Sequence, residues 1–248
     1  MQLAYDGTHY HGWQKQDNSL SIQAIIEQGL EYKTGGTGGV TGCGRTDTGV
    51  HASVFYCHFD LGDRLNNQAL ADLTHNLNSY LPDDIVVHRI FQVNPEAHAR
   101  FDAISRTYRY FIVKKKDPFN TRYAWLFKRP LKTETMNAAC KTMIRHVDFT
   151  SFSKLHSNVK TNHCRIYHAE WTENENQLTF TVSADRFLRN MVRAMVGTLI
   201  RVGKEAITVS DFEKILVSKN RQNAGESVPA KGLFLSGIDY DWEKILPK

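Results

Sequence analysis

Cysteine is scarce in this sequence, and its four copies are scattered along the 248 residues. None belongs to a C-x-x-C pair, so the spacing suggests neither a zinc site nor a disulfide framework. Long apolar runs are also missing, since none approaches the roughly 20 residues that span a bilayer. The first residues lack the layout of a signal peptide, so we expect a soluble cytoplasmic protein. We expect buried free thiols at Cys43, Cys57, Cys140 and Cys164.

A large excess of one charge is missing too, because 31 Lys and Arg residues stand against 26 Asp and Glu residues and leave a net charge of +5. The basic residues nevertheless gather in clusters. Such clusters suit a polyanion, since cations that neutralise phosphates release counterions. A solvated surface is the more ordinary interpretation of any single cluster. The clusters are Lys114 to Lys116, Lys128 with Arg129, and Arg186, Arg189 and Arg193.

The chain does contain enough apolar sequence for a real core, with 41% hydrophobic residues. Its length fits one large domain or two coupled halves. Apolar spacing in the first part predicts strands at 1–6, 52–59 and 85–91 and helices at 22–32 and 70–81. A glycine-rich stretch, residues 35–39, ends the first helix, and Pro82 ends the second. The opening strand starts so abruptly that we expect one or two residues before it.

The second part repeats this order. We predict strands at 106–113, 164–171, 178–182 and 233–240, with helices at 136–144 and 187–202. Gly203 is expected to cap the last of these helices, and Ser210 to Glu213 is expected to form a capping box that opens another. Arg186, Arg189 and Arg193 are expected to share one stripe of the helix over 187–202. Gly197 lies one turn beyond Arg193 and would let another segment approach closely.

Both halves therefore follow the order β-α-β-β-α-β, in which an antiparallel sheet carries helices on one face. We predict an α+β fold of two ferredoxin-like halves, residues 1–98 and 99–248, that merge into one long sheet. No long flexible linker separates them.

The stretch from Gly42 to Ala52 crowds glycines, Arg45 and Asp47 between two apolar runs, which indicates a sharply shaped loop. In one interpretation Asp47 is an Asx-turn acceptor for its own backbone. In another, Arg45 and a second arginine hold Asp47 ionised, ready to act as a nucleophile or base. The sequence Asp-Thr-Gly also matches aspartic proteases, but a protease would need a dimer to supply a second aspartate.

Several motifs, in order, resemble the TruA family of tRNA pseudouridine synthases over nearly the whole chain. The catalytic loop of that family is similar to residues 44–52. The other motifs are Leu3 to Thr8 with Tyr10 to Gln14, Ala99 to Phe101 with Ala103, Arg106 to Tyr110, Asp148 to Phe152, Phe187 to Arg193 with Val196-Gly197, and Pro229 to Leu233.

This resemblance implies the pseudouridine synthase fold and a reaction without cofactor or metal, in which uridine in tRNA becomes pseudouridine. Asp47 matches the essential aspartate of the family, and Arg193 matches the arginine that pairs with it. Tyr108 matches the tyrosine that packs on the target uracil. Arg45 matches the loop arginine near the flipped nucleotide. Leu233 matches part of the apolar pocket wall.

The resemblance also implies that the substrate uridines lie at positions 38, 39 and 40 of the anticodon stem-loop. A homodimer is expected to grip the tRNA, and no membrane is involved. A non-catalytic RNA-binding protein and, less favoured, a dimeric aspartic protease remain as alternatives. Our candidates for phosphate contacts are Arg100, Arg106, Arg109, Arg186 and Arg189.

Overall fold

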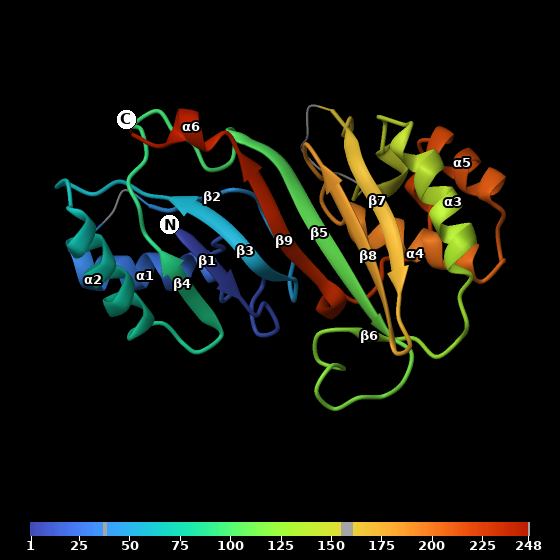
Figure 1. The fold of residues 1–248 in the computed structure, drawn as a ribbon, viewed down its shortest axis with the longest axis horizontal. Helices are drawn as coiled ribbons and strands as arrows, with labels where there is room; N and C mark the ends of the chain where they lie inside the picture. Colours follow the sequence, from blue (N-terminus) through green and yellow to red (C-terminus); the bar gives the residue numbers. More distant parts are fainter. Residues whose placement is uncertain (37–38, 155–160, 248) are drawn as a thin grey trace. The chain divides into compact units, whose positions relative to one another are not determined.

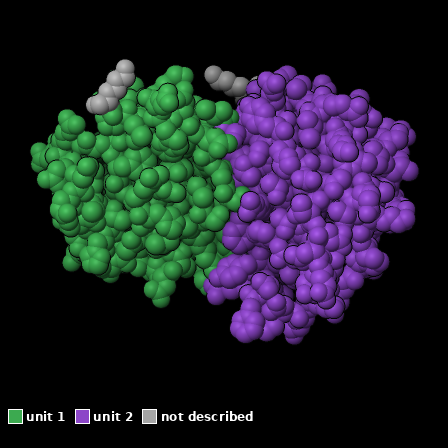
Figure 2. All heavy atoms as spheres, in the orientation of Figure 1, with its two compact units in different colours: residues 1–104, 235–248 green, residues 105–234 purple. Residues whose placement is uncertain are grey.

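A computed structural model describes residues 1–36, 39–154 and 161–247. Its chain divides into two compact units, residues 1–104 with 235–248 and residues 105–234, which are coloured separately in Figure 2. Two strands, β5 (Ala103–Val113) and β9 (Leu233–Tyr240), contain residues of both units.

The first unit contains strands in the hydrogen-bonded order β4-β1-β3-β9, in which β1 is antiparallel to both β3 and β4, and β2 pairs antiparallel with β3. Helices α1 and α2 contact each other, and α2 packs against β4 (Figure 1). Besides its part of β9, this unit consists of β1 (Gln2–Tyr5), α1 (Ile22–Thr34), β2 (Thr41–Gly42), β3 (His51–His58), α2 (Asn67–Asn78), β4 (Ile85–Arg89) and α6 (Trp242–Ile245).

Helix α1 forms where its sequence predicts. The Ser21 hydroxyl accepts the Ala24 N–H at 3.3 Å, which satisfies one of the free donors at the helix start. Gly35 ends the helix at a φ of 75°, and its N–H donates to Glu31 O. The helix buries Ile22, Ile26 and Leu30 completely. Of the glycine-rich stretch behind it, residues 37 and 38 lie outside the described residues.

In the second unit β8 pairs antiparallel with both β5 and β7, and α3, α4 and α5 contact one another (Figure 1). The predicted alternation along β8 is confirmed, because Leu178, Phe180 and Val182 are all buried. Besides β5, this unit contains β6 (Trp125–Leu126), α3 (Thr133–Ile144), β7 (Ile166–Glu173), β8 (Gln177–Ala184), α4 (Met191–Gly203), α5 (Val209–Val217) and the 3-10 turns Thr150–Phe152, Arg221–Asn223 and Ala230–Gly232.

The strand order confirms the predicted fold class. Hydrogen bonds join the described strands in the order β4-β1-β3-β9-β5-β8-β7. The set β1 to β4 and the set β5, β7, β8 and β9 share one pattern, in which the first strand lies between the fourth and third and the second strand pairs with the third. The division at residue 98 stays a prediction, since the compact units group most of β9 with the first unit.

The predicted start of the helix at 187 is wrong, because α4 begins at Met191. Asn190 takes a left-handed conformation with a φ of 65°, which an α-helix cannot contain. Arg186 and Arg189 therefore precede the helix, and the predicted stripe of three arginines is wrong. Of these three arginines, Arg193 alone lies on α4.

Two predicted helix ends also differ. Gly203 is the last residue of α4 rather than its cap, and a Cβ there would lie 2.3 Å from Met136 Sδ, so the glycine permits close packing on α3. The capping box of α5 uses Thr208 and Asp211, two residues before the predicted start of the box. The Asp211 N–H donates to Thr208 Oγ1 at 3.1 Å, and the Thr208 N–H donates to Asp211 Oδ2 at 3.2 Å.

The prediction of buried free thiols is confirmed for all four cysteines. Burial raises the pKa of the Cys57 thiol to about 12, so this thiol stays protonated at neutral pH. Among the described residues no helix has the length and apolar character that crossing a membrane requires.

Candidate active site

Asp47 lies in the loop between β2 and β3, where its side chain is partly buried. The main chain closes the turn around it, since the Val50 N–H donates to the Asp47 carbonyl oxygen at 3.1 Å. Gly49 allows this turn with a φ of 74°. A main-chain hydrogen bond therefore contributes to closing the turn around Asp47.

The segment from Tyr5 to Trp13 fixes the loop on both sides of Asp47. Before Asp47, the hydroxyl groups of Tyr5 and Thr46 are 2.8 Å apart, and the Trp13 N–H donates to Thr46 O at 3.3 Å. After Asp47, the Gly49 N–H donates to Tyr10 O at 3.2 Å. These contacts join residues 33 to 41 positions apart in sequence and hold the backbone that carries the carboxylate.

Two glycines make this close approach possible. A Cβ at Gly7 would lie 2.0 Å from Val50 O, and one at Gly12 would lie 2.3 Å from Thr46 O. The buried His51 follows the loop, with its Nδ1 2.9 Å from Asp6 Oδ1 and 3.1 Å from the Gly7 nitrogen. The sequence predicted no role for these neighbours. The motif over Leu3 to Thr8 and Tyr10 to Gln14 is the feature of the sequence that contains most of them.

Arg45 is exposed on the same loop, two residues before Asp47. Its Nε donates to Gln14 Oε1 at 2.9 Å. Gln14 belongs to the same motif that holds the Asp47 backbone. One short segment of the first unit therefore contacts the cation of the candidate site and the residues on both sides of its acid.

In the second unit, Arg193 lies in the first turn of α4 and is partly buried. Its Nε donates to Val228 O at 2.7 Å. The Tyr110 hydroxyl donates to the next carbonyl, Pro229 O, at 2.8 Å. Burial raises the pKa of Tyr110, and the charge of Arg193 opposes this rise. The loop before Leu233 therefore accepts hydrogen bonds from a residue of α4 and from a residue of β5.

The close approach predicted at Gly197 is confirmed. A Cβ at Gly197 would lie 1.8 Å from Glu226 O, and one at Gly225 would lie 2.8 Å from the Gly197 carbonyl carbon. The Gly225 N–H donates to Thr198 Oγ1 at 2.8 Å. The loop from Ala224 to Pro229 thus rests directly on the backbone of α4.

Tyr108 lies two residues before Tyr110 on β5 and shares its face of the strand. Its ring meets that of Phe187 edge-on, with the centroids 5.1 Å apart. Leu233 is buried at the start of β9. In this unit Tyr108 thus lies on β5, Arg193 lies on α4, and Leu233 follows the loop that hydrogen-bonds to both elements.

The five candidates for phosphate contacts differ in exposure. Arg106 is partly buried, and its Nη1 donates to Asp185 O at 2.8 Å. Arg186 is also partly buried. The guanidinium carbon of Arg100 lies 5.9 Å from the ring centroid of Phe101, a cation–π contact. The exposed members of the set are Arg100, Arg109 and Arg189.

The chain is similar to known proteins over nearly its whole length. A model of the tRNA pseudouridine synthase family matches residues 2–102 and 139–241. The chain belongs to this family. A protein named tRNA pseudouridine synthase A from Bacteroides fragilis is 51% identical over 243 residues, which cover 97% of this chain and 95% of its own.

Two further relatives with the same name extend this similarity. The protein from Parabacteroides distasonis is 47% identical over 245 residues, 99% of this chain and 96% of its own. That from Clostridium acetobutylicum is 40% identical over 242 residues, 97% of this chain and 98% of its own. The tRNA pseudouridine synthases are isomerases, so the family accounts for the Asp-Thr-Gly sequence without a protease.

The match to tRNA pseudouridine synthases covers the Asp47 loop and α4, whereas Tyr108 lies between the two matched ranges. Arg45, Asp47 and Arg100 belong to the first unit, and Tyr108, Arg193 and the remaining candidates belong to the second. The predicted pairing of Asp47 with Arg193 joins residues of different units and stays a prediction.

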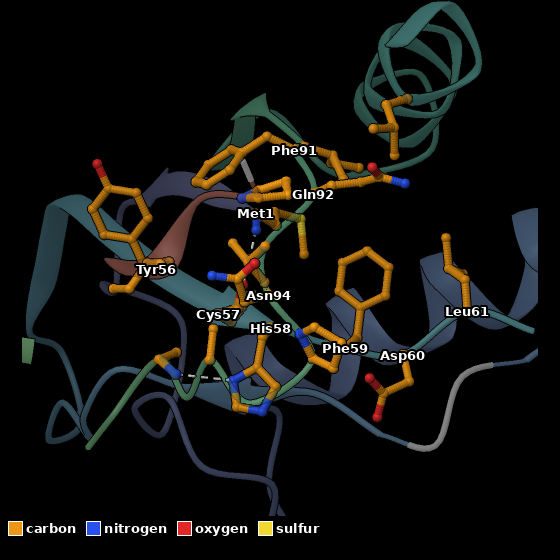
Figure 3. Close-up of a pocket in the computed structure, with 18 of the residues that line it drawn as sticks. Met1, Tyr56, Cys57, His58, Phe59, Asp60, Leu61, Phe91, Gln92 and Asn94 are labelled. Carbon is orange, nitrogen blue, oxygen red and sulfur yellow. Dashed lines mark hydrogen bonds between the residues drawn. The ribbon is translucent and has the colours of Figure 1, made fainter. Parts of the chain in front are cut away.

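A cavity of about 820 Å³ in the first unit is not the pocket of Asp47. Met1, Tyr56, His58 and Phe91 line it at the C-terminal end of β3 (Figure 3). The Asp47 loop precedes the other end of this strand, roughly 20 Å away at about 3.3 Å per residue. The described residues also hold no cluster of three or more His, Cys, Asp or Glu side chains that suits a metal ion.

Proposed function

We propose that this protein isomerises uridine to pseudouridine at positions 38, 39 and 40 of the tRNA anticodon stem-loop. Family membership supports the reaction and the class of substrate. We assign Asp47 as the reactive centre because hydrogen bonds hold the backbone of its loop on both sides of the carboxylate. We further propose that the enzyme works in the cytoplasm as a homodimer.

In the proposed reaction Asp47 acts in its ionised form as a nucleophile, either at the sugar or on the base. The N-glycosidic bond breaks, the uracil turns over, and C5 of the ring forms the new bond to the sugar. The bond to Asp47 breaks again, C5 loses its proton to water, and N1, freed from the sugar, gains one. Substrate and product have the same composition, so the reaction needs no oxidant or reductant. The fixed backbone around Asp47 favours this chemistry, because attack depends on the position of the nucleophile.

The remaining candidates take supporting roles in this proposal. Arg193 pairs with Asp47 and keeps it ionised. Tyr108 stacks on the target uracil, its hydroxyl is available to relay a proton, and Leu233 forms part of the apolar wall. Arg45 binds a phosphate or fills the stack that the extruded base leaves.

Extruding the base costs a few kcal/mol, which contacts to the RNA backbone must offset. We assign these contacts to exposed and partly buried arginines of both units. Long cationic side chains can reach phosphates without reading sequence. The residues are Arg100, Arg106, Arg109, Arg186 and Arg189.

Release of tritium from tRNA that carries 5-tritiated uridine tests this function. Asp47→Asn keeps the size of the side chain and the turn closed by Val50 but removes the negative charge. We expect loss of nearly all release, whereas the exposed loop control Asp17→Asn should match wild type. Equal release by wild type and Asp47→Asn would refute the catalytic role. Salt-dependent tRNA binding without release in wild type would favour a non-catalytic RNA-binding protein.

A further inference from the structure

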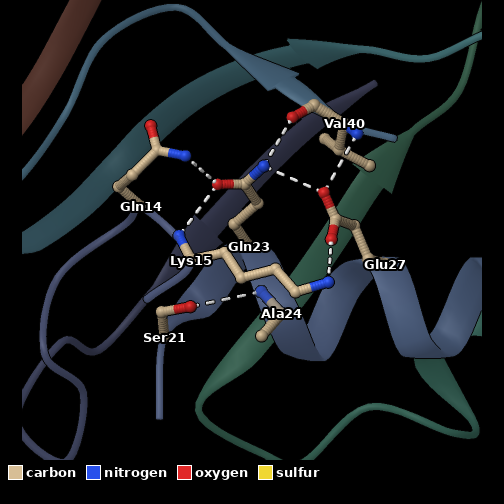
Figure 4. A network of polar contacts seen from close by, with 7 residues as sticks. All are labelled: Gln14, Lys15, Ser21, Gln23, Ala24, Glu27 and Val40. Atoms are coloured by element: carbon tan, nitrogen blue, oxygen red, sulfur yellow. Dashed lines mark hydrogen bonds and ion pairs between the residues drawn. The ribbon is translucent and has the colours of Figure 1, made fainter. Parts of the chain in front are cut away.

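A row of polar side chains runs from Arg45 into helix α1. The Gln14 amide lies between Arg45 and Gln23. From Gln14 the row continues through the Gln23 amide to Glu27 (Figure 4). Arg45 Nε donates to Gln14 Oε1 at 2.9 Å, and Gln14 Nε2 donates to Gln23 Oε1 at 2.6 Å. Gln23 Nε2 in turn donates to Glu27 Oε1 at 2.9 Å.

The ends of this row determine the direction of both amides. The Glu27 carboxylate only accepts hydrogen bonds, so the amide of Gln23 must turn its NH₂ group toward it. The carbonyl of Gln23 then faces Gln14, which must offer its own NH₂ group. Gln14 is left with its carbonyl toward Arg45, whose guanidinium only donates. Reversing either amide would place two donors or two acceptors face to face.

Additional contacts hold the inner part of the row. Gln23 is only 9% exposed, its Oε1 also accepts the Lys15 N–H at 2.9 Å, and its Nε2 also donates to Val40 O at 2.9 Å. Glu27 accepts the Val40 N–H at 3.2 Å and forms an ion pair with Lys15 at 3.0 Å. Burial would raise the pKa of Glu27, but these hydrogen bonds outweigh it and keep the pKa below its usual value.

We propose that Gln14 and Gln23 are positioning residues that orient the guanidinium of Arg45 toward the RNA substrate. This inference rests on the proposed function. The row engages Nε, the inner donor of Arg45, and among the described residues neither terminal Nη group of this exposed side chain has a hydrogen-bond partner. A planar guanidinium with its Nη groups preset matches a phosphate or a base stack, and less rotamer entropy is lost on binding.

A double-mutant cycle tests the inference. Methionine has the length of glutamine without its hydrogen bonds, so the variants are Gln14→Met, Gln23→Met and Arg45→Met, with each glutamine variant also combined with Arg45→Met. We expect Gln14→Met to lower kcat/KM by about tenfold, which corresponds to about 1.4 kcal/mol. In the Arg45→Met background the same change should not lower kcat/KM further, because the guanidinium that Gln14 orients is absent. The matched control is Gln16→Met, an exposed glutamine of the same loop, which should stay within about twofold of wild type.

A second measurement does not depend on catalysis. In ¹⁵N-labelled protein, the Arg45 Nε–H should exchange slowly with water in wild type and quickly in both Gln14→Met and Gln23→Met. Circular dichroism shows whether each variant is folded. If Gln14→Met unfolds, Gln23→Met, one step further from Arg45, gives the same comparison.

The outcomes separate the two proposals. An inactive wild type with a slowly exchanging Arg45 Nε–H that depends on both glutamines refutes the proposed function and leaves the orientation of Arg45 intact. An active wild type in which Gln14→Met costs the same factor with and without Arg45 refutes the inference and leaves the function intact. Full activity of Arg45→Met refutes the inference as well.

Discussion

At the scale of single residues, glycines determine where the Asp47 carboxylate can lie. Gly12 combines a left-handed backbone, with a φ of 89°, and a distance of 2.3 Å between an added Cβ and Thr46 O. Both features exclude a side chain, one through conformation and the other through space. The residue before Asp47 is thereby pressed against the segment that also supplies Gln14.

Replacing Gly12 by alanine should therefore destabilise the protein and displace the loop. The left-handed conformation alone costs about 1–3 kcal/mol for a residue with a Cβ. Thermal unfolding should show a lower free energy of unfolding, and tritium release should fall because Asp47 moves. Gly44→Ala is the matched control for stability, since Gly44 has no atom within 4 Å of an added Cβ and no left-handed φ. Equal stability of the two variants would contradict the role of Gly12.

The sequence singles out Asp47 and Arg45 as candidates but does not show the groups that hold them. Their loop stands out through its glycines and its resemblance to a family motif. The partners Tyr5 and Gln14 are 41 and 31 positions away from Thr46 and Arg45, and such hydrogen bonds leave no periodic pattern. The direction of an amide is likewise absent from the sequence, because it depends on the whole row of donors and acceptors.

At the scale of elements, helix α4 shows both the strength and the failure of apolar spacing. The spacing correctly identified a helix that buries Met195 and Leu199. It misplaced the start, because Phe187 and Leu188 continue the apolar pattern although Asn190 turns the chain with a left-handed residue. Periodicity reports which side chains face the core and does not report a local φ.

Replacing Gly197 by alanine should separate α4 from the loop before Leu233. The new Cβ would meet the backbone oxygen of Glu226 at 1.8 Å, and a backbone atom cannot move aside as a side chain does. We expect a loss of about 2–3 kcal/mol in the free energy of unfolding, measured with urea. The control Gly29→Ala, inside α1, would meet side-chain atoms and no backbone, with the Tyr80 ring at 3.2 Å and Leu77 Cδ2 at 3.4 Å, and should be neutral or stabilising by up to about 1 kcal/mol. Similar losses in both variants would contradict this explanation.

The turn at Thr150 depends on the charge of Asp148. Burial raises the pKa of Asp148, but hydrogen bonds from Thr150 and the ion pair with Lys219 at 2.9 Å outweigh it and lower the pKa from 3.8 to about 2. A lowered pKa in the folded state adds stability above the unfolded value, and this stability is lost as the pH falls toward 2. Urea unfolding from pH 5 to 2 should therefore show a smaller pH-dependent loss in Asp148→Asn than in wild type. Parallel curves would refute this role.

At the scale of the whole molecule, the repeated order of elements predicted the fold class but could not give the order of strands. The sequence gives the order of strands and helices along the chain in each half. The position of β9 next to both β3 and β5 instead results from pairings between segments that are distant in sequence. Such pairings depend on which edges remain available after local structure forms. The prediction of two halves thus followed from local patterns, and the compact units follow from long-range contacts.

The mild net charge of +5 predicts that RNA binding depends on a few well-placed cations. Each arginine that neutralises a phosphate releases counterions, so the logarithm of the binding constant falls linearly with the logarithm of the salt concentration. Arg109 is exposed on β5, and Arg109→Gln should reduce the magnitude of this slope by about 1. Fluorescence anisotropy with a labelled anticodon stem-loop RNA at several salt concentrations measures this slope.

The exposed Lys204, which is not among the proposed contacts, provides the control Lys204→Gln. An unchanged slope for Arg109→Gln would remove Arg109 from the RNA-binding surface, whereas an equal reduction in both variants would show that general charge, not a specific contact, determines binding.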